Sequence, residues 1–476
     1  MTTAVAAPAS LRIRQIVGFL VCVELASGVL QGYYTPLFTD IAHHLSIKDA
    51  SVNWFEAAQL VVSALVVPVL ARMGDLVGHR KVLLLSTTVT AVASWAVAFA
   101  PSFTTFLIAW AVQGFYVVWL PLEISIIHQR TAATGEQTRL TRRSAAFLVA
   151  ALEAGVIVGA GVSGALAGSI PITVVLMGPA VAVTACLAVV WFGIADTPPR
   201  DQGSVDLAGL FWAVVTIGLV MCGLILVRVD GPGSLWPWLV ILLGFAAVVP
   251  FARVELASPD PLVDVRLIVR RTQWPVQVTA FLLGMSVLGA QIPLSTFVRT
   301  DPDKAGYGLG ASAGFVSVLI VIYVLCMVVG ALAMPSVARR LGMRAAMIVA
   351  ALLITLGYAL FVPFHAEVVE LAVNMLFAGL GSGALVASVP AAAAAAAPPD
   401  RTGFVTGMTN TTKTIGGAIA SSIFAIALSS AGSIADAKAG HASLSGYITV
   451  WIVCAATALL AAVLLRLAPR DAFGEL

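Results

Sequence analysis

Long apolar runs, separated by short polar connections, fill almost the whole chain of 476 residues. A bilayer crossing needs about 20 apolar residues in an α-helix, and each run is long enough. Fourteen runs are bounded by charges, by Gly or Pro turns, or by polar clusters. The pattern therefore predicts an all-α membrane protein with 14 transmembrane helices. Their approximate limits are 15–39, 52–72, 80–100, 103–127, 144–167, 170–194, 205–228, 235–253, 274–298, 311–337, 345–364, 367–393, 403–430 and 446–467.

Composition excludes several other classes of protein. Hydrophobic residues make up 60% of the chain and charged residues only 10%, whereas soluble domains carry about 25% charge. The net charge of +3 is too small and scattered for a nucleic-acid partner. The five cysteines lie singly in apolar runs, so we expect no metal, no cofactor and no disulfide framework. No cluster of catalytic residues and no phosphate-binding loop with Lys is present, so we expect neither an enzyme nor direct ATP coupling.

The basic residues predict the orientation of the helices in the membrane. With both termini inside, 20 of the 26 Lys and Arg residues fall on cytoplasmic segments and only five fall outside, while Lys413 lies within a span. The first run is too long for a cleaved signal sequence. Basic residues are mostly Arg, which is typical of a GC-rich bacterial genome. We therefore expect a monomeric, multi-pass protein in a bacterial cytoplasmic membrane, with both termini cytoplasmic.

Short internal matches predict two parallel repeats. The segments 71–80 and 336–344 align so that Gly78 and Arg80 correspond to Gly342 and Arg344. Two parallel six-helix repeats are a known transporter architecture. The expected division is an N-terminal six-helix bundle (residues 1–195), a linker with a transmembrane hairpin (196–271) and a C-terminal six-helix bundle (272–476).

The segment Gly74-Asp-Leu-Val-Gly-His-Arg-Lys81 resembles the signature cytoplasmic loop of the major facilitator superfamily. The resemblance implies that Gly74, Asp75, Gly78, Arg80 and Lys81 form a conformational switch between spans 2 and 3. Gly allows backbone conformations that other residues resist. A carboxylate at Asp75 is expected to pair with Arg80, Arg130 or a helix N-terminus.

A second resemblance points to the 14-span drug:proton antiporter branch of that superfamily. Asn410-Thr-Thr-Lys-Thr-Ile-Gly-Gly-Ala418 is similar to the branch's pattern of Asn, a basic residue and paired glycines. The chain also departs from the branch. Trp110 stands where an arginine associated with proton transfer is usual, span 5 lacks the Gly-Pro dipeptide, and Glu24 lies nearly one turn before the usual acid position, Ser27.

Charged residues inside the spans are the candidates for chemistry. A charge at the bilayer centre costs at least about 2.5 kcal/mol, so such residues are rarely kept without a function. A carboxyl group in a low-dielectric cavity can exchange a proton between two water phases. Glu24, Glu153 and Glu123 are therefore candidates for proton coupling. A structural pairing of Glu123 with Arg130 or Arg142 remains open, and Lys413 could bind an anionic group, repel a proton-loaded state or pair with an acid.

An amphipathic substrate cavity is expected between the two halves. Aromatic rings with a few amides suit a flat, partly apolar organic molecule. The leading hypothesis is export of a small drug or natural product in exchange for protons, which would mean multidrug efflux and antibiotic resistance. The alternative is a proton-driven uptake symporter of the same fold. The expected cavity residues are Gln31, Tyr34, Trp110, Gln113, Trp119, Gln291, Asn374, Asn410 and Lys413.

Overall fold

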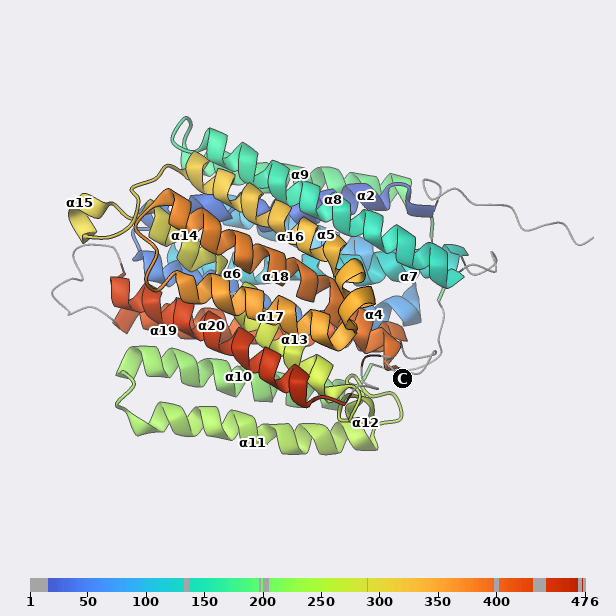
Figure 1. Ribbon diagram of the computed structural model, residues 1–476. Helices are drawn as coiled ribbons and strands as arrows, with labels where there is room; N and C mark the ends of the chain where they lie inside the picture. The colour runs from blue at the N-terminus through green and yellow to red at the C-terminus, as the bar shows by residue number, and fades with distance from the viewer. Residues whose placement is uncertain are drawn as a thin grey trace, which may run out of the picture.

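The computed structural model describes residues 16–131, 137–196, 198–199, 205–288, 290–397, 402–430, 442–469 and 473. Within these ranges every regular element is a helix, and the long helices run roughly parallel or antiparallel to one another (Figure 1). Thirteen of them are long and apolar enough to cross a membrane by length and composition. The predicted all-α membrane fold is thereby confirmed.

The helices follow the order of the predicted spans. The first group comprises α2 (Leu20–Tyr33), η1 (Thr35–Leu37), α3 (Phe38–His44), η2 (Asp49–Val52), α4 (Asn53–Val77), α5 (His79–Ala98), α6 (Phe103–Gln113), η3 (Gly114–Val118), α7 (Trp119–Thr131), α8 (Gln137–Leu166) and α9 (Ile172–Gly193). A hairpin of α10 (Leu207–Asp230) and α11 (Leu235–Ala257) follows, and then the short α12 (Val265–Ile268). The last group comprises α13 (Trp274–Val287), α14 (Gln291–Arg299), α15 (Pro302–Ala305), α16 (Ala313–Leu341), α17 (Met343–Leu360), α18 (Val368–Ala395), α19 (Thr402–Ser430) and α20 (Leu444–Leu467).

The first predicted span is a broken helix. Its main segment, α2, has only 14 residues, and the chain continues through η1 into α3. Pro36 lies at the start of η1. Proline has no backbone N–H and its ring clashes with the preceding turn, so a continuous helix is unfavourable at this point. The corresponding span of the last group is divided in the same way, into α13 and α14.

The match between the two signature-like segments extends to their conformation. Gly78 ends α4 with φ 104° and ψ 129°, and Gly342 ends α16 with φ 85° and ψ 154°. Side chains other than Gly rarely adopt a positive φ of this kind. Arg80 donates to a backbone carbonyl near the end of α9 (2.7 Å), and Arg344 donates to one near the end of α20 (3.0 Å). In each group of helices, the segment therefore makes the same turn and is hydrogen-bonded to the last helix of that group.

Buried apolar side chains form two large clusters. One contains residues from 16 to 194 together with Ile292, and the other contains residues from 267 to 473 together with Ala50. We call these two groups of helices the N-half and the C-half. The α10–α11 hairpin lies along one side of them (Figure 1), where Val220 and Leu224 pack against Ile423 and Ile426 of α19.

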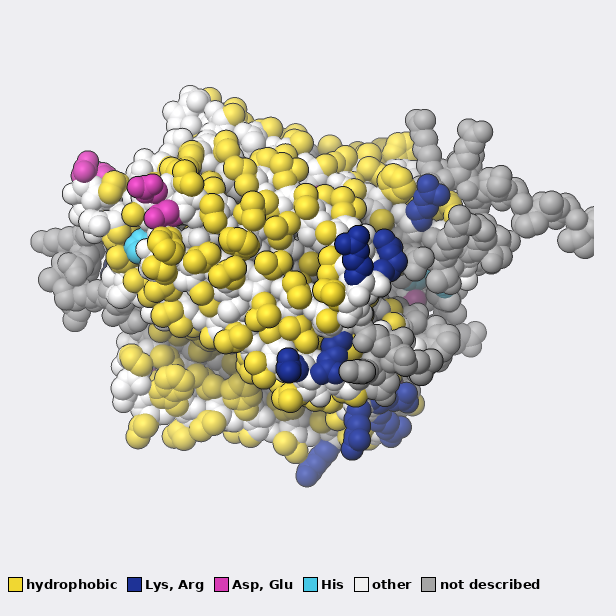
Figure 2. All heavy atoms as spheres, in the orientation of Figure 1, with side chains coloured by type: hydrophobic (Ala, Val, Ile, Leu, Met, Phe, Trp, Pro, Cys, Tyr) yellow, Lys and Arg dark blue, Asp and Glu magenta, His cyan; other side chains and the backbone are white. Residues whose placement is uncertain are grey.

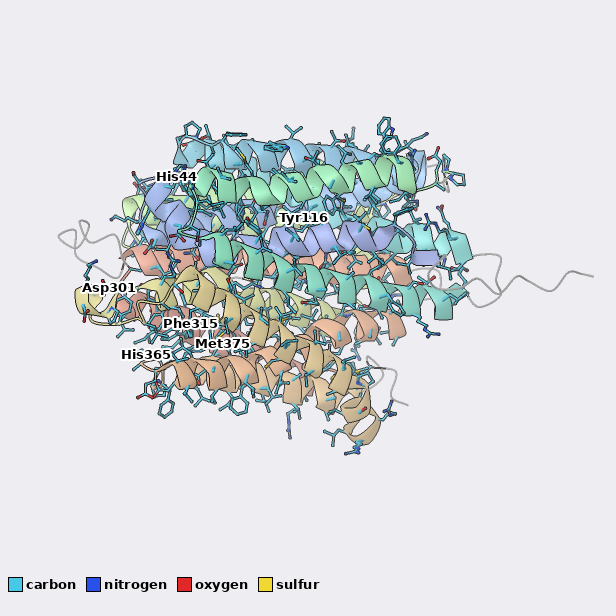
Figure 3. All side chains as sticks on the ribbon, turned by 90° about the horizontal axis from the view of Figure 1, so that it is seen from above. His44, Tyr116, Asp301, Phe315, His365 and Met375 are labelled. Atoms are coloured by element: carbon cyan, nitrogen blue, oxygen red, sulfur yellow. The ribbon has the colours of Figure 1, made fainter. Side chains whose placement is uncertain are left out.

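The surface has an apolar belt with charged ends (Figure 2). Large apolar side chains are exposed along the belt, for example Phe192 at 86% and Leu332 at 74%. Arginines gather at the end of the bundle where α4 meets α5 and α16 meets α17, and we call this the basic end. Figure 3 shows His44, Asp301 and His365 together at the other end, which we call the opposite end.

Candidate functional site

The N-half and the C-half are joined by polar contacts near the opposite end. Two hydroxyl groups of the C-half donate to backbone carbonyls of the N-half, and one ion pair links α3 to α14. The contacts are Ser295 Oγ to the Thr35 carbonyl (2.6 Å), Ser317 Oγ to the Ala160 carbonyl (2.7 Å) and the Arg299 guanidinium to the Asp40 carboxylate (2.7 Å).

Close packing reinforces this closure. A Cβ atom at Gly164 of α8 would lie 2.0 Å from the Ser317 hydroxyl of α16, so the two helices touch at this level. A Cβ atom at Gly417 of α19 would lie 3.0 Å from the Leu60 side chain of α4. Small residues allow membrane helices to approach this closely. The halves therefore meet tightly along α8–α16 and α4–α19 in the part of the helices near the opposite end.

Glu153 and Lys413 lie just on the basic-end side of this closed contact. Glu153 precedes Ala160 by seven residues on α8, which is two helical turns on the same face, or about 10 Å. Lys413 precedes Gly417 by one turn on α19, or about 6 Å. Each is half-buried, and the opposite charges attract each other across the two halves. Among the described residues neither side chain has a hydrogen-bond partner.

Two amides occupy equivalent positions in the broken first spans. Gln31 precedes Thr35 by one turn, and Gln291 precedes Ser295 by one turn, so each lies one turn from the hydrogen bond that joins these spans. Both amide side chains are exposed. Asn410, half-buried, lies less than one turn before Lys413 on α19. Gln31, Gln291, Glu153 and Lys413 thus approach the same closed contact from the basic-end side.

Glu24 and Glu123 form a second feature, inside the N-half. Both side chains are 0% exposed, and none of their four carboxyl oxygens has a hydrogen-bond partner in the described part of the chain. Their carboxyl groups are within interaction distance of each other. Arg130 attracts Glu123 electrostatically and donates to the carbonyl of Ile16 (2.8 Å). The structure thus brings together two of the three predicted proton-coupling residues and leaves Glu153 at the contact between the halves.

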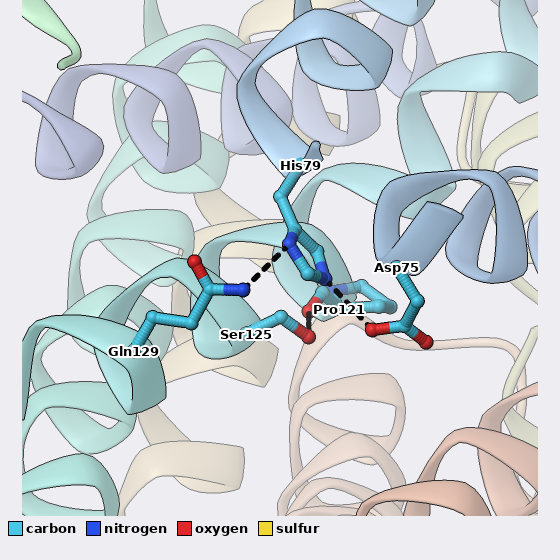
Figure 4. Close-up of polar contacts among 5 residues, drawn as sticks. All are labelled: Asp75, His79, Pro121, Ser125 and Gln129. Carbon is cyan, nitrogen blue, oxygen red and sulfur yellow. Dashed lines mark hydrogen bonds and ion pairs between the residues drawn. The ribbon is translucent and has the colours of Figure 1, made fainter. Parts of the chain in front are cut away.

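The signature loop is organised around a buried histidine (Figure 4). His79 is 1% exposed; its Nε2 lies 3.3 Å from a carboxylate oxygen of Asp75, and its Nδ1 lies 3.3 Å from the amide nitrogen of Gln129 on α7. The expected pairing of Asp75 with Arg80 or Arg130 is wrong for the described residues. Arg80 instead turns toward α9, because the positive φ of Gly78 reverses the chain just before it.

The other predicted loop residues lie on either side of this histidine. Gly74 is buried, and a Cβ atom there would come within 2.9 Å of the His79 ring and of Leu122. Lys81 is exposed at the basic end. Ser125, one turn before Gln129 on α7, donates to the Pro121 carbonyl (3.0 Å; Figure 4). The loop is therefore packed against α7 as well as α9.

Four predicted cavity residues are buried within the N-half. Gln113 donates to the hydroxyl of Tyr34 (3.0 Å), and the Tyr34 ring packs edge-on against Trp110 at 4.5 Å. Trp119 is 0% exposed and donates to Ser86 (3.1 Å). Asn374, in the C-half, is also buried and donates to a backbone carbonyl ten residues earlier (2.7 Å). These contacts stabilise the individual halves, so the structure does not gather these five residues with Glu153 and Lys413.

Two halves of six spans each, closed at one end around polar side chains from both, define a membrane transport protein. A sequence model of the Major Facilitator Superfamily matches residues 20–420 and 276–474. The chain belongs to this superfamily, and it is a transporter rather than an enzyme. This confirms the superfamily and leaves the 14-span drug:proton antiporter branch unsupported.

A curated relative is the uridine/deoxyuridine transporter of Lactococcus lactis subsp. cremoris (strain MG1363). It is 25% identical over 291 residues, which are 58% of this chain and 58% of that protein, so the chain matches little more than half of the relative's length. The prediction of multidrug efflux and antibiotic resistance is contradicted, because the relative's name is that of a nucleoside transporter. Composition and loop motifs identify the superfamily but carry no information on the substrate.

Solved structures share the fold over nearly the whole chain. The crystal structure of the nucleoside transporter NupG has a TM-score of 0.64 at 14% identity and covers 96% of this chain and 99% of its own. The POT family transporter PepTSo has a TM-score of 0.68 at 15% identity and covers 97% and 99%. At such identities the likeness shows the fold alone.

Proposed function

We propose that this protein is a proton-coupled symporter that takes up a nucleoside-like compound by alternating access. The observation that carries the proposal is the closed contact at the opposite end, with Gln31, Gln291, Glu153 and Lys413 just beneath it. Polar side chains from both halves at one level, beside a contact that must open and close, are what a substrate site in this architecture requires. The named uridine/deoxyuridine transporter supports the substrate class.

The basic end is the cytoplasmic end in this proposal. The clustering of Arg at that end agrees with the rule that positive residues remain inside (Figure 2). The contact described here then closes the outer side of the proposed substrate site. The protein works as a monomer in a bacterial cytoplasmic membrane, with both termini inside.

Substrate recognition falls to amide side chains beside this contact. Gln31 makes one long hydrogen bond, from its amide nitrogen to the Ser27 hydroxyl one turn earlier (3.4 Å). Amides at Gln31, Gln291 and Asn410 both donate and accept hydrogen bonds, which suits the hydroxyl groups of a sugar and the edge of a base. Tyr34, Trp110, Gln113, Trp119 and Asn374 make their described contacts within their own half, so in the proposal they hold the shape of the halves.

Glu24 and Glu123 are the proposed proton site. Two facing carboxyl groups repel each other when both are ionised, whereas a single proton lets one donate to the other. Both belong to the N-half and are separated from water in the described state, so loading or unloading the proton requires the surrounding helices to move. Arg130 favours the ionised form of Glu123, and in the proposal it promotes the release of the proton from Glu123 toward the cytoplasm.

The signature loop is the proposed conformational switch. His79 connects Asp75 of α4 with Gln129 of α7, and Arg80 connects the loop with α9. Gly74, Gly78 and Lys81 shape the turn that carries these contacts. In the proposal, the movement of the N-half that opens the outer side changes this set of contacts.

The proposal is tested by uptake of radiolabelled uridine into proteoliposomes. Wild type should take up uridine and exchange it with internal unlabelled uridine, and an acidic exterior should drive accumulation above the external concentration. Glu24→Gln and Glu123→Gln should keep exchange and lose proton-driven accumulation. Asp303→Asn is a matched control, because this carboxylate is exposed on α15 outside the proposed site. Absence of any uridine exchange by wild type would refute the substrate class.

A further inference from the structure

Glu153 and Lys413 present opposite charges from opposite halves without pairing directly. Each feels the charge of the other, yet neither has a hydrogen bond or an ion pair within the described part of the chain. Both are half-buried, and each lies one or two turns toward the basic end from a point where its helix contacts the other half. Holding two such groups apart inside a membrane protein is costly, because a charge at that depth is stabilised chiefly by a partner.

The hydrogen-bonding capacities of the two groups define what fits between them. An ionised carboxylate only accepts hydrogen bonds, and a lysine ammonium only donates them. A ligand that offers acceptors alone would leave Glu153 unsatisfied, and one that offers donors alone would leave Lys413 unsatisfied. Leaving a desolvated charged group without a partner costs more than a hydrogen bond returns.

We propose that Glu153 and Lys413 recognise the imide edge of a pyrimidine base, with the N–H of the base donating to Glu153 and an adjacent carbonyl accepting from Lys413. The inference rests on the proposed function, since it specifies which part of a nucleoside this site reads. An uncharged edge with one donor next to an acceptor gives a hydrogen bond to both the Glu153 carboxylate and the Lys413 ammonium. Because the edge adds no charge, the opposite charges of the two side chains still balance. Because the two residues belong to different halves, a base bound in this way also bridges the halves.

The position of the pair connects recognition with movement. Glu153 lies about 10 Å along α8 from the Ser317 contact, and Lys413 lies about 6 Å along α19 from the Leu60 contact. A ligand that draws the two side chains together acts on the same helices that make the closed contact. A ligand that satisfies only one of them acts on one half alone and cannot bridge the two.

The test compares uridine with 3-methyluridine, in which a methyl group replaces the hydrogen of the imide N–H. Competition against radiolabelled uridine exchange in proteoliposomes gives the apparent affinity of each compound. In wild type, 3-methyluridine should compete about 10- to 100-fold more weakly than uridine, as expected for the loss of one hydrogen bond to a charged group. Equal competition by the two compounds, with uridine exchange intact, would overturn the inference and leave the proposed function standing.

Variants of Glu153 and Lys413 test whether these two side chains cause the discrimination against 3-methyluridine. Glu153→Ala should reduce the discrimination between the two compounds to less than about threefold, whereas Glu153→Gln should retain most of it, because an amide carbonyl still accepts from the N–H. Lys413→Met should lower the apparent affinity for uridine about tenfold or more, whereas Lys413→Arg should retain most of the wild-type affinity. Asp303→Ala is the control for removal of a carboxylate outside the site.

Two further results separate the possible failures. If wild type exchanges no uridine but a zwitterionic dipeptide competes for a dipeptide probe, the proposed substrate class and the imide assignment both fail. If Glu153→Ala still discriminates against 3-methyluridine as wild type does, the base is read elsewhere and only this inference fails. Elution of each variant as a single peak in detergent gel filtration shows that a loss of exchange does not come from misfolding.

Discussion

The ion pair between Arg299 and Asp40 is expected to hold the opposite end closed. The two side chains belong to α14 of the C-half and α3 of the N-half, and they meet at 2.7 Å. Replacing Arg299 by Gln removes the charge and keeps much of the side chain's length. Because both residues must separate when the halves open at this end, the substitution should favour the outward-open state.

The size of the effect follows from how exposed the pair is. The side chains of Arg299 and Asp40 are 15% and 30% exposed, so the pair is neither buried nor fully in water. A hydrogen bond to a charged group contributes about 1.5–3 kcal/mol, and a fully exposed pair contributes about 0.2–1 kcal/mol. A contribution of about 1–2 kcal/mol lies between these limits. It corresponds to a change of about 5- to 30-fold in the ratio of closed to open molecules.

Distances between spin labels measure this ratio. One label is placed at His44 and one at Val369, which are exposed near the opposite end in the two halves, in a background without the five native cysteines. Arg299→Gln should enlarge the population with the longer distance. Lys304→Gln serves as the control, because Lys304 pairs with Asp301 within the C-half at 3.1 Å. An unchanged distance distribution in Arg299→Gln would refute the role of the ion pair.

Three further predictions concern packing, the loop and the proton site. Gly155→Ala should lower the free energy of unfolding in detergent by about 1–3 kcal/mol, because its Cβ would lie 2.3 Å from a backbone carbonyl of α2. Gly161→Ala is the control and should be nearly neutral, because no atom lies within 4 Å of the added Cβ. Gly78→Ala should lower the free energy of unfolding by about 1–2 kcal/mol and slow uridine exchange, because a residue with a Cβ atom rarely adopts the φ of 104° found here. An unchanged melting temperature would contradict this prediction. The double variant of Glu24→Gln and Glu123→Gln should lose proton-driven accumulation no more completely than either single variant, because the pair acts as one site; additive losses would argue for two separate sites.

Much of the fold could be predicted from the sequence because a membrane imposes a simple rule. Every long apolar run must form a helix, since the bilayer interior offers no partner for backbone polar groups. The break at Pro36 was not predicted, because the apolar run continues through it and hydropathy does not register a change of backbone conformation. The repeat was visible at Gly78 and Gly342, where the same backbone geometry requires the same residue.

The site could be predicted only in part. Costly charges such as Glu24 and Lys413 stand out in an apolar sequence, whatever their surroundings. Which face of a helix meets the other half is not encoded locally, so Trp119, which is packed against its own half, could not be told from a cavity residue. Asp40 and Arg299 were missed for a related reason. They lie 259 residues apart, each in the second segment of a broken span, and only the assembled halves bring them together.

The most direct test of the account is the movement of protons when uridine is added without an imposed gradient. Proteoliposomes containing the protein and a trapped pH indicator are given external uridine, with the membrane potential clamped to zero. A symporter carries protons inward with uridine, so the interior should become more acidic, and Glu24→Gln should abolish the change while retaining uridine exchange. Alkalinisation of the interior would show antiport, and uridine entry with no change of pH would show uncoupled transport; either result would contradict proton-driven uptake.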